Sequence, residues 1–486
     1  MWLEVGCVDC KVVRCTEAER AWLETYLSFT DANARFRKGA GSDRIRMLNA
    51  FSMTFPAGLL PLVLARAPEE GFTIECSDTL QAPCLPDADA DLEWLRDYQL
   101  EAVKRAEARR RGILWCPTGS GKTEIAIGLA QYLPCTWLFL VHKANLMTQT
   151  ADRYELRTKL PAGRVGDGVW DIPRDSRFIV ATFQTIDRRM KRDKRVKMMM
   201  EDVRGLIVDE CHVLPAWSFW NVSMGCINTH WRIGMSGTPL ARGDRRSVFA
   251  IAALGPVIYR IKSDVLIERG VIAKPHVRMV RVEHRGTLET TWGEVYGTSI
   301  TRSARRNSTI VEMARRAKKP ALVFVKEIRH GKELEKQLWA AGVKAGFVWG
   351  KFTGSSRMTQ VKDLVAGRID VLVCSAVFQE GVDIPELRSV IVASAGKSVI
   401  ATLQRLGRGM RVERDRNNKV VEGGDEFDVW DVDDTGCGCT ERTKDTGELV
   451  HHGCKWLEHH SRDRRNAYTR EGYETVREEV VPAENS

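Results

Sequence analysis

Residues 116–124 read CPTGSGKTE, directly after the apolar run GILW and before a helical pattern that continues to Leu133. Glycines in such a loop let backbone N–H groups close around phosphates, and the N-terminus of the next helix adds its positive end. A strand, a glycine-rich loop and a helix in this order are typical of parallel α/β sheets. This segment therefore predicts an α/β fold with a phosphate-binding loop.

The polar residues of this loop predict how a nucleotide is held. Lys122 can reach the β- and γ-phosphates, and the Thr123 hydroxyl can hold Mg²⁺. Cys116 stands where the strict pattern has its first glycine, a position that needs only to turn the chain. The alternative, a chance glycine turn, is disfavoured by the strand and helix on either side. The predicted nucleotide contacts are Thr118, Gly119, Ser120, Gly121, Lys122 and Thr123.

Residues 206–212 read LIVDECH, an apolar strand that ends in two carboxylates. Asp209 would coordinate Mg²⁺ through water, and Glu210 would orient or deprotonate the attacking water as the general base. Alone, such a pair is more often a solvated strand end. The phosphate-binding loop upstream favours the catalytic interpretation.

Short apolar runs alternate with helical stretches along most of the chain, which indicates buried parallel strands. GILWC, TWLFLVH, RFIVATF and GLIVDE form one series, and ALVFV, AGFVW, DVLVC and SVIVAS form a second. The acidic, proline-flanked PDADADLEW reads as a linker. The pattern weakens over residues 262–301, which suits a connection between lobes. We therefore predict a small α+β region over 1–90, α/β lobes over 91–262 and 263–435, and a Cys/His-containing loop with a C-terminal helix over 436–486.

The charge balance points to a polyanionic partner. The chain has 74 basic and 64 acidic residues, a net charge of +10, and such an excess suits phosphate-backbone binding without naming it. No run of eighteen apolar residues occurs, and the N-terminus lacks a secretory pattern. The 13 cysteines are an odd number, which indicates reduced thiols. We expect a protein of the cytoplasm.

Four motifs together resemble those of superfamily 2 helicases, in the order that the family has them. They are PTGSGKT, DECH, SGTP at residues 236–239 and QRLGRGMR at residues 404–411, and the resemblance covers roughly residues 92–434. It implies two RecA-like lobes with ATP and Mg²⁺ bound between them. It also implies a nucleic-acid-dependent ATPase.

The resemblance assigns further roles by position in the motifs. Gln99 in LRDYQ matches an adenine-contacting glutamine, and Gly381 and Asp383 in VFQEGVDIPEL match positions that link ATP to the nucleic acid. Arg408 and Arg411 match paired arginines, and cations from a second lobe are what a transferring γ-phosphoryl group needs. The remaining assignments are Gln404 in the same motif, and Lys143, Thr182 and Gln184 as sequence-independent nucleic-acid contacts.

Other segments resemble the XPB and UvsW branch of DNA helicases. DECH differs from the DEAD of RNA-unwinding enzymes, and ERGVIAKP and the ending WLEHHSRDRRNAYTREGYETV are similar to that branch. The region containing FPAGLLPLVLARAPEEGFTIE is similar in place to a small DNA-engaging domain of UvsW-type enzymes. The resemblance implies remodelling of single-stranded or branched DNA in replication, recombination or repair. It also implies a protein of a bacterial or phage-infected host cytoplasm. The alternatives are an RNA helicase, a double-stranded DNA translocase serving a larger complex, and a nucleotide-gated scaffold.

Three smaller features stay open at this level. RRMKRDKRVK, residues 188–197, holds seven basic residues and one acidic residue, so it is either a DNA grip or a solvated helix face. A late cluster could ligate Zn²⁺, but its CGC spacing favours a loop with reduced thiols. An early cysteine group lacks an obvious fourth ligand. The two groups are Cys437, Cys439, His451, His452, Cys454, His459 and His460, and Cys7, Cys10 and Cys15.

Overall fold

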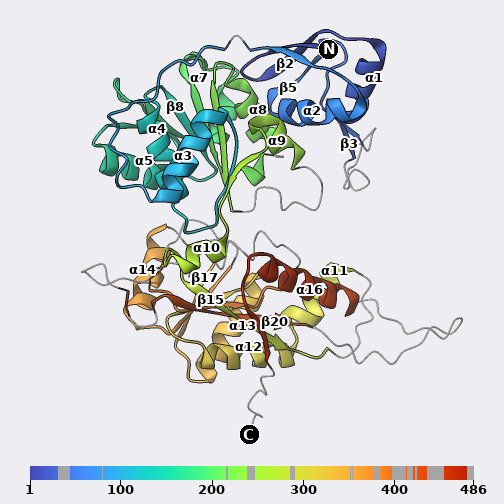
Figure 1. Cartoon of the computed structure of the whole chain (residues 1–486). Helices are drawn as coiled ribbons and strands as arrows, with labels where there is room; N and C mark the ends of the chain where they lie inside the picture. The colour runs from blue at the N-terminus through green and yellow to red at the C-terminus, as the bar shows by residue number, and fades with distance from the viewer. Residues whose placement is uncertain are drawn as a thin grey trace, which may run out of the picture. The chain divides into compact units, whose positions relative to one another are not determined.

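The computed structural model (Figure 1) divides the chain into two compact units. The first contains residues 1–117 and 121–261, and the second contains residues 118–120 and 262–486. The residues that the structure describes are 1–30, 44–78, 80–214, 217–237, 247–284, 291–350, 352, 354–375, 384, 386–396, 412, 420–421, 424–434 and 454–478.

The N-terminal region is a small α+β layer. Its sheet has the order β5-β2-β1-β6, and helix α1 begins with a capping box in which Thr16 and Glu19 satisfy each other's backbone N–H groups. Alternate residues of β1 and β2, such as Leu3 and Val12, face the buried core. The elements are β1 (Trp2–Val5), β2 (Asp9–Arg14), α1 (Glu17–Tyr26), β3 (Ser28–Thr30), β4 (Arg44–Arg46), β5 (Thr54–Pro56), α2 (Leu60–Arg66) and β6 (Glu75–Ser77).

This region packs on the lobe that follows it. Phe55, Leu59 and Val63 share one hydrophobic cluster with Val248 and Ala252 of helix α9 (Val248–Leu254). The 3₁₀ turn η2 (Ala57–Leu59) crosses α9 closely enough that a Cβ on Gly58 would lie 2.2 Å from the Ile251 carbonyl oxygen. The N-terminal region and the first lobe therefore share a core.

An eight-stranded sheet forms the centre of the first lobe, in the order β10-β9-β11-β8-β12-β13-β7-β14. Every neighbouring pair is parallel except β10 with β9. Its central strands are continuous apolar runs because both faces are covered. The strands are β7 (Arg111–Trp115), β8 (Trp137–Val141), β9 (Ala162–Gly166), β10 (Val169–Asp171), β11 (Phe178–Thr182), β12 (Gly205–Asp209), β13 (Trp231–Ser236) and β14 (Val257–Arg260).

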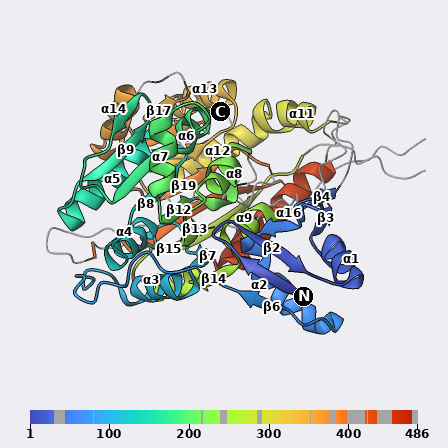
Figure 2. The ribbon, with the colours of Figure 1, turned by 90° about the horizontal axis from the view of Figure 1, so that it is seen from above.

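Helices cover both faces of this sheet (Figure 2). On one face lie α3, α4 and α5, where Tyr154 stacks on Phe178 at 4.5 Å between ring centroids. The other face carries α6 to α9, and Ile186, Val196 and Phe219 pack there against the strands. The helices are α3 (Asp97–Arg109), α4 (Lys122–Tyr132), α5 (Ala144–Thr158), α6 (Phe183–Arg189), α7 (Lys194–Asp202), α8 (Trp217–Gly225) and α9.

The second unit has its own parallel sheet, in the order β17-β18-β16-β19-β20-β15-β21. Its core cluster draws only on residues between Val280 and Val432. The elements are α10 (Ser263–Glu268), β15 (Lys274–Arg281), α11 (Trp292–Val295), α12 (Ala304–Arg316), β16 (Ala321–Phe324), α13 (Ile328–Ala340), β17 (Ala345–Val348), α14 (Gly354–Val365), β18 (Val371–Cys374), β19 (Ser389–Val392), β20 (Glu426–Asp433), α16 (Cys454–Arg470) and β21 (Thr475–Glu478).

Strand β15 lies in the segment where the sequence pattern weakens. Residues 262–301 suited a connection between lobes, and the structure adds that β15 in this segment pairs in parallel with both β20 and β21. Its alternating pattern, KPHVRMVR, buries Pro275, Val277 and Met279 and leaves His276 and Arg278 between them partly exposed. That alternation is weaker than the continuous apolar runs of the other strands.

Strand β20 ends in a buried acidic segment that α16 and α12 neutralise. Arg464 of α16 bonds to Asp431 at 2.9 Å, and Arg306 of α12 bonds to Asp434 at 3.0 Å. Asp434 also lies 2.8 Å from His284 Nε2. Buried carboxylates of this kind need such partners, because an unpaired buried charge is costly.

The predicted fold class, two tandem parallel-sheet lobes with a small α+β region before them, is confirmed by these sheets. The residue boundaries predicted for the four regions of the chain stay predictions. Among the described residues, no helix is both long and apolar enough to cross a bilayer.

Candidate active site

The glycine-rich loop joins β7 to α4 and is shaped by left-handed backbone. Gly119 has φ +86° and Gly121 has φ +80°, conformations that glycine adopts without strain. A Cβ on Gly121 would lie 2.4 Å from Gln99 Nε2, so the position also lacks space for a side chain. Within the described residues no side chain caps α4 at Gly121. Successive backbone N–H groups in such a turn, at the start of a helix, fit a phosphate group.

The acidic pair stands at the carboxyl end of β12, two strands from β7. Glu210 adopts a left-handed conformation with φ +48°, and its backbone N–H donates to Asp209 Oδ1 at 3.0 Å. Non-glycine residues rarely adopt this region, and such strain is common at functional sites. The turn directs Glu210 toward the loop, where its Oε1 lies 3.4 Å from Lys122 Nζ.

Two further side chains hold the second oxygen of Glu210. Ser236, the last residue of β13, donates its hydroxyl to Glu210 Oε2 at 3.2 Å. His212 Nδ1 lies 3.3 Å from the same oxygen and 3.1 Å from Ser236 Oγ. Because β12, β13 and β7 are adjacent parallel strands, their carboxyl ends bring Lys122, Glu210 and Ser236 together.

The pKa values of the two carboxyls, Asp209 and Glu210, shift in opposite directions. Burial, together with the neighbouring Glu210 charge, raises the pKa of Asp209 to about 6. Burial also acts on Glu210, but Lys122 and His212 outweigh it and hold the pKa of that carboxyl below its usual range. Burial opposes the Lys122 charge, yet Glu210 and Asp209 together raise the pKa of its ammonium. The arrangement keeps Glu210 ionised, as a general base requires.

Gln99, predicted to contact adenine, lies beside the loop. It is buried at the start of α3, where its Oε1 accepts the Arg96 backbone N–H at 3.0 Å. Its Nε2 donates to the Tyr98 hydroxyl at 3.4 Å. The structure thus places Gln99 against Gly121, and its role toward the base stays a prediction.

The three predicted nucleic-acid contacts lie at the same edge of the sheet, after β8 and β11. Lys143 is the N-cap residue of α5, and Gln184 donates to the His142 carbonyl at 2.9 Å, which joins the two segments. Thr182 is buried, with its hydroxyl bonded to Thr185 at 2.9 Å. Lys143 and Gln184 are therefore better exposed for a ligand than Thr182.

Other predicted site residues fall outside the described residues. The motif residues of the second lobe are among them, as are the last two residues of SGTP. Sequence reasoning gave no role to His212, and none to Trp115, whose Nε1 donates to the Gly237 carbonyl at 2.9 Å. The position of His212 inside DECH was its only signal. The site residues outside the described part are Gln404, Arg408, Arg411, Gly381 and Asp383.

The cysteine and histidine groups give no ligand set within the described residues, where no three metal-binding side chains cluster. Cys10 is buried in the N-terminal core, and burial raises the pKa of its thiol to about 12. His460 packs edge-on against Trp292 at 4.3 Å, whereas His459 lies 3.4 Å from Asp463. The side chains of Cys437, Cys439, His451, His452 and Cys454 lie outside the described part.

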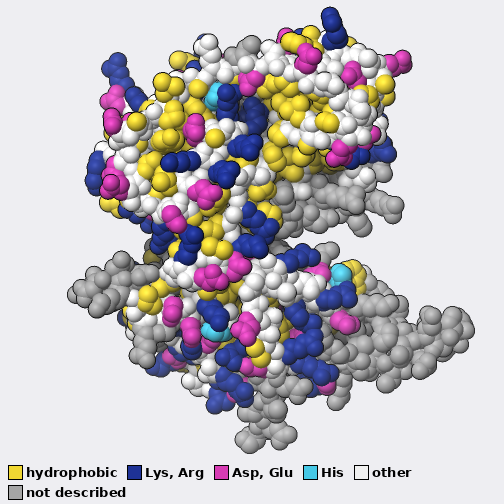
Figure 3. All heavy atoms as spheres, viewed as in Figure 1, with side chains coloured by type: hydrophobic (Ala, Val, Ile, Leu, Met, Phe, Trp, Pro, Cys, Tyr) yellow, Lys and Arg dark blue, Asp and Glu magenta, His cyan; other side chains and the backbone are white. Residues whose placement is uncertain are grey.

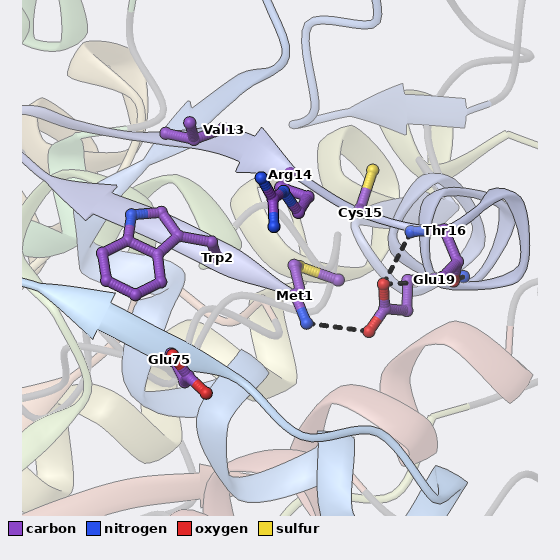
Figure 4. A pocket seen from close by; sticks show the side chains of 8 residues that line it. All are labelled: Met1, Trp2, Val13, Arg14, Cys15, Thr16, Glu19 and Glu75. Carbon is purple, nitrogen blue, oxygen red and sulfur yellow. Dashed lines mark hydrogen bonds and ion pairs between the residues drawn. The ribbon is translucent and has the colours of Figure 1, made fainter.

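A separate cavity of about 810 Å³ lies in the N-terminal region (Figure 4). Its lining comes only from residues 1–75 and includes no predicted site residue. Glu19 bonds there to the Met1 amino group at 2.9 Å and to the Thr16 backbone N–H at 2.7 Å. The other lining residues are Trp2, Val13, Arg14, Cys15 and Glu75.

One face of the molecule carries side chains of both charges. On the face shown in Figure 3, Lys and Arg side chains lie among Asp and Glu side chains. The net charge of +10 therefore does not by itself locate a nucleic-acid surface.

Two family models match this chain. The model described as "Type III restriction enzyme, res subunit" matches residues 93–241, and the "Helicase conserved C-terminal domain" matches residues 305–413. The first match contains the loop, the acidic pair and SGTP. The second contains QRLGRGMR. Helicases of these families use a nucleotide, typically with Mg²⁺.

Curated relatives and solved structures are also similar to this chain. "Putative DNA 3'-5' helicase Rad25" of Halobacterium salinarum is 30% identical over 65% of this chain and 52% of its own length. The structure of T4 UvsW aligns over 99% of both chains at 22% identity with a TM-score of 0.45. The DNA-bound restriction-modification enzyme LlaBIII aligns over 81% of this chain and 32% of its own at 17% identity, with a TM-score of 0.57, and so shares the fold.

The chain spans between 52% and 63% of the length of the first three curated relatives that it matches. Both helicase domains nevertheless occur in the order that the motifs predicted, and the prediction of the family is confirmed. The chain contains both domains of a superfamily 2 helicase, and the curated relatives that it resembles include proteins named Rad25 and XPB2.

Proposed function

We propose that this protein is an ATP-dependent DNA helicase or translocase that remodels single-stranded or branched DNA. One observation carries the proposal most directly. Lys122, Glu210, Ser236 and His212 meet in one network at the carboxyl edge of the first sheet. A protein that only bound nucleotide would need no carboxylate held ionised beside its phosphate-binding lysine.

The residues of the first lobe would have separate roles in binding and hydrolysing ATP. The loop from Thr118 to Thr123 would cradle the phosphates, with Lys122 on the β- and γ-phosphates. The hydroxyl of Thr123 and the carboxylate of Asp209 would hold Mg²⁺, which supplies charge neutralisation for the transferred phosphoryl group. Glu210 would take the proton from the attacking water, and Ser236 and His212 would fix its orientation.

The second lobe would complete the reaction. Arg408 and Arg411 would stabilise the charge on the transferring group, with Gln404 in the same motif. Gly381 and Asp383 would link this chemistry to the nucleic acid. These assignments rest on the helicase motifs, and their residues lie outside the described part of the chain.

The proposed nucleic acid is DNA. Relatives named as DNA 3'-5' helicases or translocases support this choice. Lys143, Thr182 and Gln184 would contact the DNA backbone. They lie at the sheet edge after β8 and β11, next to the nucleotide site. The carbonyl of His142 accepts from Gln184 at 2.9 Å, which joins the segments that carry Lys143 and Gln184.

The test is ATP hydrolysis with Mg²⁺ alone and with single-stranded DNA, duplex DNA, a four-way junction or RNA. Branched or single-stranded DNA should stimulate turnover, and Glu210→Gln should lower it by about 10²- to 10⁴-fold, the usual contribution of a general base. Stimulation of ATP hydrolysis by RNA alone would mean that the protein acts on RNA and not on DNA. Absence of any stimulated, Glu210-dependent hydrolysis would overturn it. Strand displacement then separates a helicase from a translocase.

A further inference from the structure

A strongly basic corner lies between helices α6 and α7, and nothing in the nucleotide site uses it. We define this basic corner as residues 188–197, which carry seven basic side chains and one acidic side chain. It includes the end of α6 (Phe183–Arg189), a short turn and the start of α7 (Lys194–Asp202). The sequence alone left open whether it grips DNA or is a solvated helix face.

The backbone of the corner is well ordered by hydrogen bonds. The N–H groups of Arg192 and Asp193 both donate to the Arg189 carbonyl, at 3.0 and 2.8 Å. Asp193 then caps α7 by accepting the Arg195 backbone N–H at 3.0 Å. Val196 and Met199 anchor α7 in the core of the lobe. The corner therefore presents its side chains from a fixed frame.

Two arginines of the corner, Arg189 and Arg195, contact neighbouring side chains and stabilise its structure. The guanidinium groups of Arg189 and Arg195 lie 5.1 and 5.0 Å from the centre of the Trp170 ring. Both also pair with Asp193, at 2.7 and 3.3 Å. The single carboxylate of the corner is thus shared by two cations that already contact an aromatic face.

The other five basic side chains point to solvent. No acidic residue within the corner remains to neutralise them, because Asp193 serves Arg189 and Arg195. Cations crowded in this way repel one another, which costs free energy unless a polyanion binds. The exposed side chains are Arg188, Lys191, Arg192, Lys194 and Lys197.

The position of the corner relates it to the predicted nucleic-acid edge. Helix α6 begins at Phe183, directly after Thr182, and Gln184 lies in its first turn. Seven helical residues at 1.5 Å each span about 10 Å. The corner therefore lies about three base-pair steps of 3.4 Å from the edge contacts.

We propose that the basic corner is a second DNA-backbone site, which binds phosphates of the DNA that flanks the segment engaged at Lys143 and Gln184. The inference rests on the proposed function, because it extends the same nucleic acid across the lobe. A mixture of lysines and arginines on one helix corner suits sequence-independent phosphate contacts. Binding there strengthens the grip on DNA without changing the chemistry at Glu210.

The test compares two variants with the same loss of charge. The first is the triple variant Lys191→Gln, Arg192→Gln and Lys194→Gln, which spares Trp170, Arg189 and Arg195. The control is Lys104→Gln, Arg105→Gln and Arg109→Gln on α3, which covers the opposite face of the sheet (Figure 2). Affinity for a labelled forked duplex is measured across a salt series, together with the maximal ATPase rate at saturating DNA.

Loss of three phosphate contacts should reduce the slope of log affinity against log salt by about 2 to 3, since each contact contributes about 0.9. The corner variant should show this change and keep its maximal ATPase rate, while the α3 control should match the unmodified protein. Equal slopes in all three proteins would overturn the corner as a DNA site, with the motor intact. An unmodified protein that neither binds DNA nor responds to it would overturn the proposed function instead.

Discussion

Individual side chains around Glu210 differ in what they contribute. Lys122 faces one oxygen of the carboxylate, whereas His212 and Ser236 share the other. Hydrogen bonds to a charged group contribute about 1.5 to 3 kcal/mol each. His212 and Ser236 both face Glu210 Oε2, so we expect them to be positioning residues that act through Glu210.

His212→Ala should therefore lower kcat for ATP hydrolysis by about tenfold, the equivalent of roughly 1.4 kcal/mol. KM for ATP should stay close to its original value, because the phosphate-binding loop is untouched. Steady-state kinetics on the single variant and on His212→Ala in a Glu210→Gln background test this. In the double variant the substitution should add nothing. A raised KM with unchanged kcat would assign His212 to substrate binding instead.

Asp434 is the second residue whose environment leads to a prediction. It is buried, and although burial raises the pKa of a carboxyl, Arg306 and His284 outweigh it and hold the pKa below the ordinary 3.8. Asp434→Asn would leave the buried Arg306 unpaired. Removal of one partner of such a pair costs about 3 to 5 kcal/mol of unfolding free energy.

The pH dependence follows from the direction of that shift. A lowered pKa in the folded state stabilises the protein above the unfolded value near 3.8, and the stabilisation is lost as pH falls toward the folded value. The difference in unfolding free energy between the unmodified protein and Asp434→Asn should thus be constant near neutrality and shrink below about pH 3.8. Denaturant titrations at several pH values measure it. A difference that grows on acidification would contradict the pairing.

Among the elements, η2 approaches α9 so closely that no space remains for a side chain at Gly58. A Cβ on Gly58 would meet two backbone carbonyl oxygens of α9, at 2.2 and 2.5 Å, and backbone cannot move aside as a side chain can. Gly58→Ala should therefore destabilise the first unit by about 1 to 3 kcal/mol, as overpacking does. Thermal unfolding measures this, with Gly293→Ala as the control, because nothing lies within 4 Å of a Cβ there. Equal melting temperatures for the two variants would show that α9 shifts and accommodates the added methyl group.

The sequence predicted some elements better than others, and the reasons are physical. Strands such as β8 and β12 are buried on both faces, so continuous apolar runs reveal them. Strand β20 reads EFDVWDVD and is also buried, but Asp431 and Asp433 are paired there with Arg464 and Arg465 of α16, a helix distant in sequence. Those partners cannot be identified from local pattern. Similarly, β15 alternates too weakly to be recognised alone.

The candidate site likewise contains residues that the sequence predicts and residues whose role appears only in the fold. The loop and the acidic pair are contiguous motifs, and the sequence predicted Lys122, Asp209 and Glu210 directly. The part taken by His212 and Ser236 depends on β12 and β13 being neighbours in the sheet, which no local spacing contains. The left-handed turn at Glu210 is likewise a property of the folded backbone.

At the scale of the whole molecule, the stability of the two units should be separable. The two clusters described in the second unit lie between Val280 and Leu457, and the two described in the first unit lie between Met1 and Val257. The described cores therefore share no residue. Unfolding of such a chain need not be two-state, since each core can be lost by itself.

Hydrogen exchange on the full chain tests this separation. Asp434→Asn should speed amide exchange in β15, β19 and β20 and leave β8, β12 and β13 unchanged, because the unpaired Arg306 weakens only the core that contains it. Gly58→Ala should give the reverse pattern. ATP with Mg²⁺ should slow exchange in the strands of the first sheet by mass action, since a ligand stabilises the state that binds it. Faster exchange in both sheets from either single substitution would mean that the molecule unfolds as one cooperative body.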